Sequence, residues 1–120
     1  MIAVIFELWP AEGQEAAYFD LAANLRTDLE KIDGFLSVER FQSLADPAKY
    51  LSLSFFRDEQ SAAAWRNFPS HRASQTLGRT GVFADYRLRV ASVLRDYGLH
   101  QRDQAPPDSR TAHAALTPLT

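Results

Sequence analysis

The stretch IDGFLSVERFQSLADPAKYLSLSFFRDEQSAAAW, residues 32–65, decides the fold of this chain. Its β-branched, aromatic and alternating apolar residues predict one strand over residues 35–43 and a second over residues 50–56. The turn-forming sequence Ala-Asp-Pro-Ala at residues 45–48 separates the two strands. Antiparallel strands can be joined by a connection this short, whereas parallel strands need a long crossover. The stretch therefore predicts an antiparallel hairpin.

The segments on either side of the hairpin predict two further strands and two helices. Asp58 is placed to cap a helix after the hairpin, and Pro69 breaks that helix because a proline inside a helix removes a hydrogen bond. The predicted elements outside the hairpin are strands at residues 2–8 and 83–97 and helices at residues 15–32, 58–67 and 70–77. The order β-α-β-β-α-β predicts an α+β, ferredoxin-like fold with two helices on one face of a four-stranded antiparallel sheet.

The length of 120 residues corresponds to one domain, which we place at residues 1–97. Residues 98–120 differ in kind, because they contain Pro106, Pro107 and Pro118 and show little apolar periodicity. We expect them to form either a disordered C-terminal tail or an arm that lies on another subunit.

The first predicted strand is apolar on both faces. Alternation places Ile2, Val4, Phe6 and Leu8 on one face and Ala3, Ile5, Glu7 and Trp9 on the other. A sheet that is apolar on both faces needs a cover on both, and the two helices cover only one. A second copy of the chain is the natural cover for the other face, which predicts a two-fold homodimer.

Composition argues against several classes of function. Hydrophobic residues make up 46% and charged residues 23% of the chain, a balance typical of soluble globular proteins. A formal net charge of -2 argues against a basic surface for nucleic acid or an anionic membrane. No run approaches the ~20 apolar residues of a membrane span, and the apolar N-terminus lacks the basic residues of a targeting segment. We therefore expect a cytoplasmic protein without nucleic-acid or membrane partners.

The motifs of common enzyme classes are absent from the sequence. It has no cysteine, which removes thiolate nucleophiles and cysteine-type metal sites, and no GxSxG, P-loop, GxGxxG or HExxH motif. His71, His100 and His113 are far apart in the chain, so we expect no histidine metal site.

Trp65 and His71 remain as candidate functional residues, one on each side of the break at Pro69. On an unbroken helix, at ~100° per residue, they would point about 240° apart, so a break is needed to bring them together. One interpretation makes Trp65 a core anchor and His71 a cap of the following turn. The other places His71 at the mouth of a cavity between helix and sheet. The expected walls of that cavity are Trp65, Phe6, Leu36 and Tyr86.

The arginines of the predicted strands also have two interpretations. Charged residues along a strand are usually solvated. Alternatively, Arg40, Arg87 or Arg89 points into the interior of the dimer and binds an anionic or phenolate ligand, for which a guanidinium is well suited.

Three features resemble the antibiotic biosynthesis monooxygenase (ABM) domain, which belongs to the dimeric α+β barrel superfamily. They are IFELWPAEG at residues 5–13, the stretch at residues 32–65, and the spacing W-x5-H from Trp65 to His71. The resemblance covers about residues 1–97. It implies a ferredoxin-like fold, a homodimer whose two sheets meet as a barrel and, in many members, oxygenation without metal or flavin.

The resemblance also implies roles for individual residues. His71 would act as the base or proton relay, Trp65 would shape the pocket and stack on an aromatic ring, and Arg40 or Arg87 would steady the substrate anion. The implied reaction oxidises an aromatic or quinol-type molecule with O2, because a deprotonated, electron-rich ring can itself pass an electron to O2. No cofactor is then needed.

Two alternatives remain open. The family's haem-degrading branch uses an Asn on the first strand, but Phe6 and Glu7 stand at the corresponding positions and the Trp-to-His spacing is shorter, so haem degradation is disfavoured. The other alternative is a non-enzymatic, ligand-binding or stress-associated dimer, since a fold by itself does not establish an activity. An open cavity reached by Trp65 and His71 would favour catalysis, and a filled core would favour this alternative.

Overall fold

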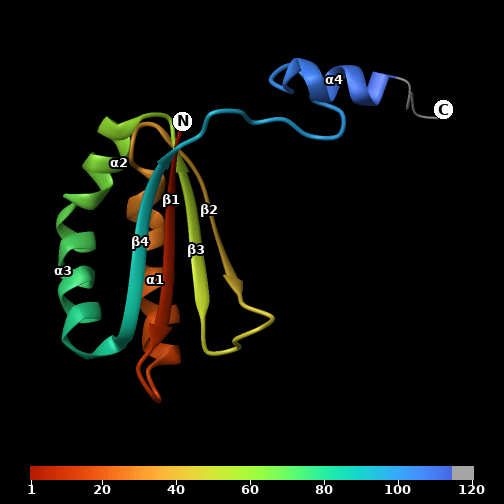
Figure 1. The fold of residues 1–120 in the computed structure, drawn as a ribbon. Helices are drawn as coiled ribbons and strands as arrows, with labels where there is room; N and C mark the ends of the chain where they lie inside the picture. Colours follow the sequence, from red (N-terminus) through yellow and green to blue (C-terminus); the bar gives the residue numbers. More distant parts are fainter. Residues whose placement is uncertain (115–120) are drawn as a thin grey trace.

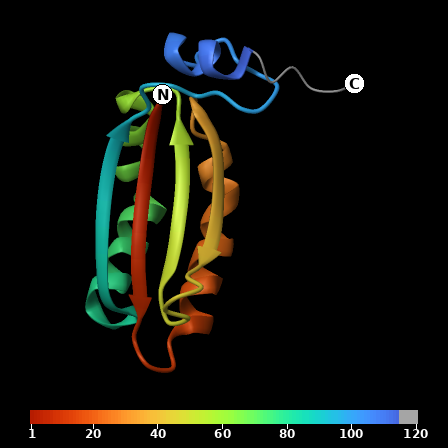
Figure 2. The same cartoon turned by 45° about the vertical axis from the view of Figure 1, so that its right-hand side comes forward.

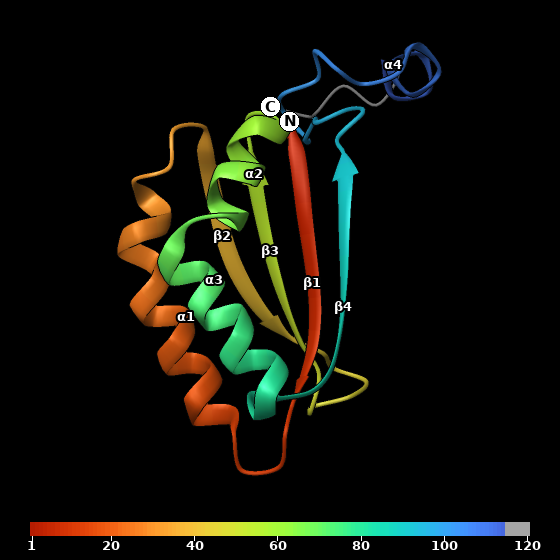
Figure 3. The same ribbon diagram turned by 90° about the vertical axis from the view of Figure 1, so that its left-hand side faces the viewer.

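The predicted hairpin is present as β2 (Phe35–Gln42) and β3 (Tyr50–Phe56) in the computed structural model, which describes residues 1–114. β1 (Ile2–Pro10) and β4 (Phe83–Ser92) complete an antiparallel sheet in the strand order β2-β3-β1-β4. The helices α1 (Glu15–Glu30), α2 (Glu59–Arg66) and α3 (Pro69–Leu77) lie on one face of this sheet (Figure 1, Figure 3), and the short π-helical turn η1 (Gly78–Val82) leads into β4. The predicted α+β, ferredoxin-like fold is therefore confirmed.

The last strand is shorter than the predicted residues 83–97. β4 ends at Ser92, which pairs with Ile2 at the start of β1, so the partner strand has no further residues to offer. The backbone N–H of Val93 donates one more hydrogen bond, to the carbonyl oxygen of Met1. The predicted end at Tyr97 is therefore wrong.

The segment after β4 leaves the sheet at the end where β1 begins (Figure 1, Figure 2). It contains α4 (Pro107–Ala114), which lies away from the sheet and from the other helices in these views. Within residues 1–114 no helix, α4 included, is both long and apolar enough to cross a membrane. Residues 115–120 of the predicted tail lie outside the described residues, and a role of this segment as an inter-subunit arm stays a prediction.

The main core lies between α1 and the sheet. Leu8 of β1 and Phe56 of β3 have no exposed surface, and Ala22 and Leu29 of α1 are buried. These positions share one face of their elements, because side chains alternate along a strand and return to the same side of a helix after three to four residues. The periodicity that predicts the elements therefore also selects the buried face.

The helix after the hairpin begins and breaks where the sequence indicates. The Asp58 carboxylate accepts hydrogen bonds from the backbone N–H of Ser61 at 2.8 Å and from its hydroxyl at 2.7 Å, which caps α2. Pro69 is the first residue of α3, and Phe68 before it is extended (φ -64°, ψ 133°), as a residue before proline prefers. The chain therefore changes direction between α2 and α3.

Gly34, between α1 and β2, is a position that tolerates no side chain. Its φ is +91°, and an added Cβ would overlap with the Oγ of Ser61 in the first turn of α2. We expect Gly34→Ala to lower the free energy of unfolding by more than the ~1–2 kcal/mol that a left-handed backbone costs an L-residue. Gly13→Ala is the matched control, because φ is +77° there and nothing lies within 4 Å of the added Cβ. Urea unfolding measures both losses, and equal losses would contradict the expected overlap.

Candidate active site

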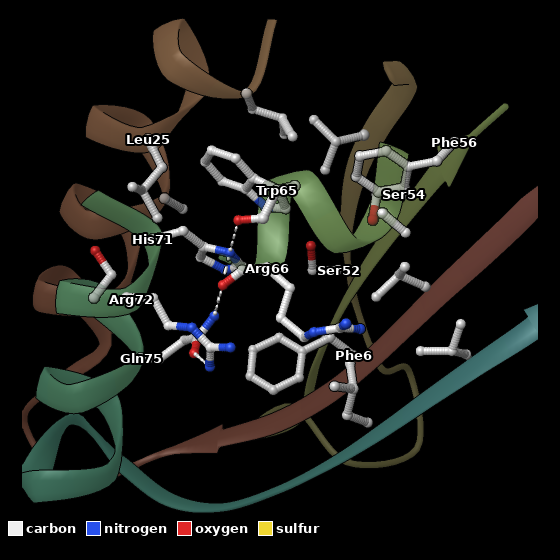
Figure 4. Close-up of a pocket in the computed structure, with 18 of the residues that line it drawn as sticks. Phe6, Leu25, Ser52, Ser54, Phe56, Trp65, Arg66, His71, Arg72 and Gln75 are labelled. Atoms are coloured by element: carbon white, nitrogen blue, oxygen red, sulfur yellow. Dashed lines mark hydrogen bonds between the residues drawn. The ribbon is translucent and has the colours of Figure 1, made fainter. Parts of the chain in front are cut away.

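A cavity of about 760 Å³ lies between the helices and the sheet (Figure 4). Its apolar walls come from α1, α2 and all four strands and include Val4, Phe6, Leu25, Val38, Phe56, Trp65 and Leu88. Its volume falls within the ~300–1,000 Å³ that small-molecule sites usually have. Of the two interpretations of Trp65 and His71, an open cavity favours the functional one.

Trp65 and His71 lie together on the wall of this cavity, although they belong to different helices. Their ring centroids are 4.4 Å apart and their planes are inclined by 13°, so the rings are stacked. The change of direction at Pro69 accounts for this arrangement, because one continuous helix would point the two side chains apart. Phe68 extends the stack on Trp65, with 5.9 Å between those ring centroids.

The hydrogen bond of the half-buried His71 ring determines which of its two nitrogens carries the proton. Nδ1 lies 3.0 Å from the carbonyl oxygen of Trp65, which can only accept, so Nδ1 carries the proton. The Gln75 amide also lies beside Nδ1, at 3.3 Å, and donates to the carbonyl oxygen of Arg66 at 3.2 Å (Figure 4). Burial lowers the pKa of His71; the hydrogen bond to Trp65 opposes this effect, and the charge of Arg72 adds to it. His71 is therefore a neutral imidazole at neutral pH, with a free lone pair on Nε2.

We expect the C2 proton of His71 to titrate below pH 6.5, the ordinary histidine pKa, because burial disfavours the imidazolium. Proton NMR across pH 4–8 measures the midpoint, and the resonance missing from His71→Ala identifies it. Trp65→Ala exposes the ring and should move the midpoint up toward 6.5. A wild-type midpoint at or above 6.5 would contradict the prediction.

The structure brings five of the seven predicted site residues to the cavity. Phe6, Arg40, Trp65, His71 and Tyr86 all line it. Phe6 and Tyr86 face each other from neighbouring strands, with ring centroids 5.6 Å apart in an edge-to-face arrangement. Phe83 lies 5.6 Å from Phe6 and completes an aromatic cluster on the floor of the cavity.

Leu36 does not line the cavity, so its predicted placement is wrong. Arg87 lies outside the cavity as well, and its predicted position in the interior of a dimer stays a prediction. A register shift between Phe35 and Ser37 makes Leu36 an extra residue in β2, and it lies instead with Ser37 and Phe55 at a shallow hollow outside the cavity. Arg87 alternates with the cavity-lining residues of β4 and pairs in register with Glu7, on the sheet face that the helices leave open.

Sequence reasoning missed Tyr18, Ser52 and Ser54 as cavity residues. Tyr18 belongs to the apolar stripe of α1, which is typical of plain core. The two serines alternate with Leu51 and Leu53, so the pattern of β3 places its polar side toward solvent, whereas the structure turns it toward the helices. The two serines on one face of β3 were the only signal in the sequence that this face lines a cavity.

Arginines dominate the ionisable groups of the cavity. Among the described residues that line it, Glu59 is the one carboxylate, and the arginines are Arg26, Arg40, Arg66, Arg72 and Arg79. Within residues 1–114, no group of three or more His, Cys, Asp or Glu side chains could hold a metal ion. An excess of guanidinium groups around a cavity with apolar walls favours an anionic guest.

Comparison with known proteins adds a family to this geometry. The family model described as antibiotic biosynthesis monooxygenase matches residues 1–77. A curated protein of Pyricularia oryzae, Jasmonate monooxygenase ABM, is 47% identical over 93 residues, which are 78% of this chain and 43% of that protein. The chain therefore spans less than half the length of this relative.

Solved structures share the fold at low sequence identity. Rv0793 from Mycobacterium tuberculosis superposes with a TM-score of 0.72 at 16% identity, over 81% of this chain and 98% of that one. A protein from Deinococcus radiodurans gives a TM-score of 0.73 at 12% identity, over 82% of this chain and 98% of that one. The match of the family model over more than half of the residues is the stronger finding, and by it the chain belongs to the antibiotic biosynthesis monooxygenase family.

Proposed function

We propose that this chain is a monooxygenase that uses O2 to oxidise a small hydroxyaromatic or quinol-type molecule in the cavity. The stack of Trp65 and His71 on the cavity wall carries the proposal, because it offers an aromatic surface and a neutral base side by side. Family membership supports the type of reaction. The name of the Pyricularia oryzae relative supports a small organic substrate and makes jasmonate a second candidate.

In the proposed reaction a hydroxyaromatic substrate supplies all of the electrons. Nε2 of His71 accepts the proton of the phenolic hydroxyl, and the resulting phenolate passes electrons to O2. One oxygen atom forms a new C–O bond at an unsubstituted ring carbon, and the other leaves as water. With 1-naphthol the products are 1,4-naphthoquinone and water, so that atoms and electrons balance without an added reductant or cofactor.

The other cavity residues provide the surroundings that this chemistry needs. Phe6, Tyr86 and Trp65 present aromatic surfaces to a flat substrate. Apolar walls exclude water, which strengthens the electrostatic interactions of the phenolate with nearby charges. Arg40 also lines the cavity and supplies a positive charge to an anionic substrate.

We also propose that two copies of the chain pair through the open face of the sheet. Residues that alternate with the cavity-lining ones face that side, among them Ile5, Leu51, Leu53 and Phe55. Glu7 on the same side bonds to Lys49 at 3.3 Å and to Arg89 at 3.5 Å. An apolar sheet face of this kind is typical of homodimer interfaces. Light scattering at micromolar concentration should give a dimeric mass, and a monomeric mass would remove this proposal.

Oxygen uptake with a panel of hydroxyaromatics and quinols tests the activity. We expect consumption above the no-protein rate with 1-naphthol and related substrates, and mass spectrometry after reaction in ¹⁸O2 should find one labelled oxygen atom in the quinone. Jasmonate is assayed with and without ascorbate, because hydroxylation of a saturated carbon needs two electrons from a reductant. A flat response across the whole panel would contradict the proposed function.

A further inference from the structure

Two buried polar atoms in the cavity wall have no hydrogen-bond partner among the described residues. They are the hydroxyl oxygen of Tyr18 and Nε of Arg40, and both residues line the cavity. Only 5% of the surface of Tyr18 is exposed. Buried polar groups are hydrogen-bonded in the great majority of proteins, because an unsatisfied one costs free energy. The pair therefore points to a guest that supplies the missing acceptors.

Both groups are donors at neutral pH. Burial raises the pKa of the Tyr18 phenol, and the charge of the neighbouring Arg40 opposes the rise, so the hydroxyl keeps its proton. A guanidinium donates and never accepts. Arg40 also lies within hydrogen-bonding reach of the Tyr18 hydroxyl, which helps to hold the pKa of the phenol down. Neither this hydroxyl nor Nε of Arg40 has a partner of ordinary geometry, so a guest can accept from both. Two adjacent donors, one of them charged, match an anion with two acceptor oxygens.

The location of the pair separates it from the Trp65–His71 stack. Tyr18 is in the first turns of α1, and Arg40 is near the end of β2 and pairs in register with Ser52. α1 begins and β2 ends at the same end of the sheet, whereas α2 lies at the opposite end (Figure 1, Figure 3). Rings of Phe83 and Tyr50 flank Tyr18, with centroids 5.8 Å and 6.2 Å from its own. The anion site thus lies toward the end of the cavity opposite α2 (Figure 1).

We propose that the substrate of this site carries a carboxylate, which accepts hydrogen bonds from Tyr18 and Arg40, and an apolar body that extends toward Trp65 and His71. This inference rests on the proposed function and refines one role in it, because it assigns Arg40 to a carboxylate rather than to the phenolate. The arginines around the cavity outnumber its carboxylate, so the net positive charge of the lining favours a carboxylate guest. The carboxylate fixes the orientation of the molecule and so selects the carbon that reaches His71.

Binding of 1-naphthylacetate and of its neutral counterpart 1-naphthylacetamide, measured by isothermal titration calorimetry on the full chain, tests this inference. The two ligands share their apolar body, and neither has a phenol to oxidise. We expect the acid to bind about 10- to 100-fold more tightly than the amide, as hydrogen bonds to a charged group allow. Tyr18→Phe and Arg40→Gln should each lower the ratio of the two dissociation constants to its square root or less, for example from about 100-fold to about 10-fold.

Lys31→Gln is the control variant. It also removes one positive charge, but Lys31 is exposed at the end of α1 and does not line the cavity, so the preference should stay. Circular dichroism checks that each variant folds, and Tyr18→Phe, which loses a single oxygen atom, keeps the test valid if Arg40→Gln does not fold.

Three outcomes would overturn the inference. The first is an acid that binds no better than the amide, including the case in which neither binds. The second is a preference that survives in Tyr18→Phe and in every folded Arg40 variant. The third is 1-naphthol binding that depends on Tyr18 and Arg40 more strongly than acid binding does, which would assign the pair to a phenol. Because these measurements need no turnover, a failure here is distinguishable from a failure of the oxygen-uptake experiment.

Discussion

Replacement of His71 by alanine is expected to lower kcat of the oxygenation by about 10²- to 10⁴-fold, the range that loss of a general base covers. The reason lies in the geometry of the ring. Its Nδ1 is held by the carbonyl oxygen of Trp65 at 3.0 Å, which leaves Nε2 free to take a proton from a molecule in the cavity. Steady-state oxygen uptake with the best substrate of the panel measures the effect.

The pH dependence of the same reaction separates a base from a structural histidine. In the proposed reaction the neutral form of His71 is the active one. Because burial lowers its pKa, the wild-type rate should hold at pH 7 and fall only below 6.5. The residual activity of His71→Ala should lack this decline. A variant whose rate falls but keeps the wild-type pH profile would show that His71 acts through structure alone.

Two further variants make the His71 result specific. Trp65→Phe keeps an aromatic ring but reduces the stacking surface, so we expect a smaller loss of turnover than in His71→Ala. His100→Ala is the matched control, because His100 is exposed beyond the end of β4 and does not line the cavity, and its rate should stay unchanged. If His71→Ala and Trp65→Phe both turn over a competent substrate at the wild-type rate, the assigned roles are wrong.

Phe56→Ala is expected to lower the free energy of unfolding by about 3–5 kcal/mol, the usual cost of removing a buried phenylalanine ring. The side chain has no exposed surface and packs edge-to-face on Phe35, with ring centroids 5.9 Å apart. Its loss enlarges the existing cavity at the end nearest α2, where the surrounding elements cannot close the space without moving. Urea unfolding at a fixed protein concentration measures the change.

Phe55→Ala is the matched control for this prediction, because the neighbouring residue lies on the opposite face of β3 and is partly exposed. We expect a clearly smaller loss of stability for the same change in chemistry. Repeating both unfolding curves at several protein concentrations separates a loss in the core from a loss at the proposed subunit contact. Equal losses in the two variants at low concentration would contradict the assignment of faces.

Most of the fold follows from local patterns that the chain carries along its length. Period-two alternation, the turn at residues 45–48, the N-cap at Asp58 and the break at Pro69 each act over a few residues, so they can be recognised without knowing the partners. The end of β4 could not be predicted in this way. Residues 94–97 continue a strand-like pattern, but the pairing of β4 with β1 runs only to Ser92 opposite Ile2, with one further hydrogen bond from Val93 to Met1.

In the candidate site, too, some features follow from local sequence patterns and others depend on residues that are distant in the sequence. The sequence by itself determined that Trp65 and His71 flank a helix break and that Arg40 and Phe6 are available, because these depend on residue type and spacing. Only the tertiary structure decided which face each strand residue takes: one extra residue in β2 removed Leu36 from the cavity, and the register of β4 turned Arg87 away from it. The unpartnered Tyr18 and Arg40 likewise appear only after folding, since whether a buried donor finds an acceptor depends on what distant elements place opposite it.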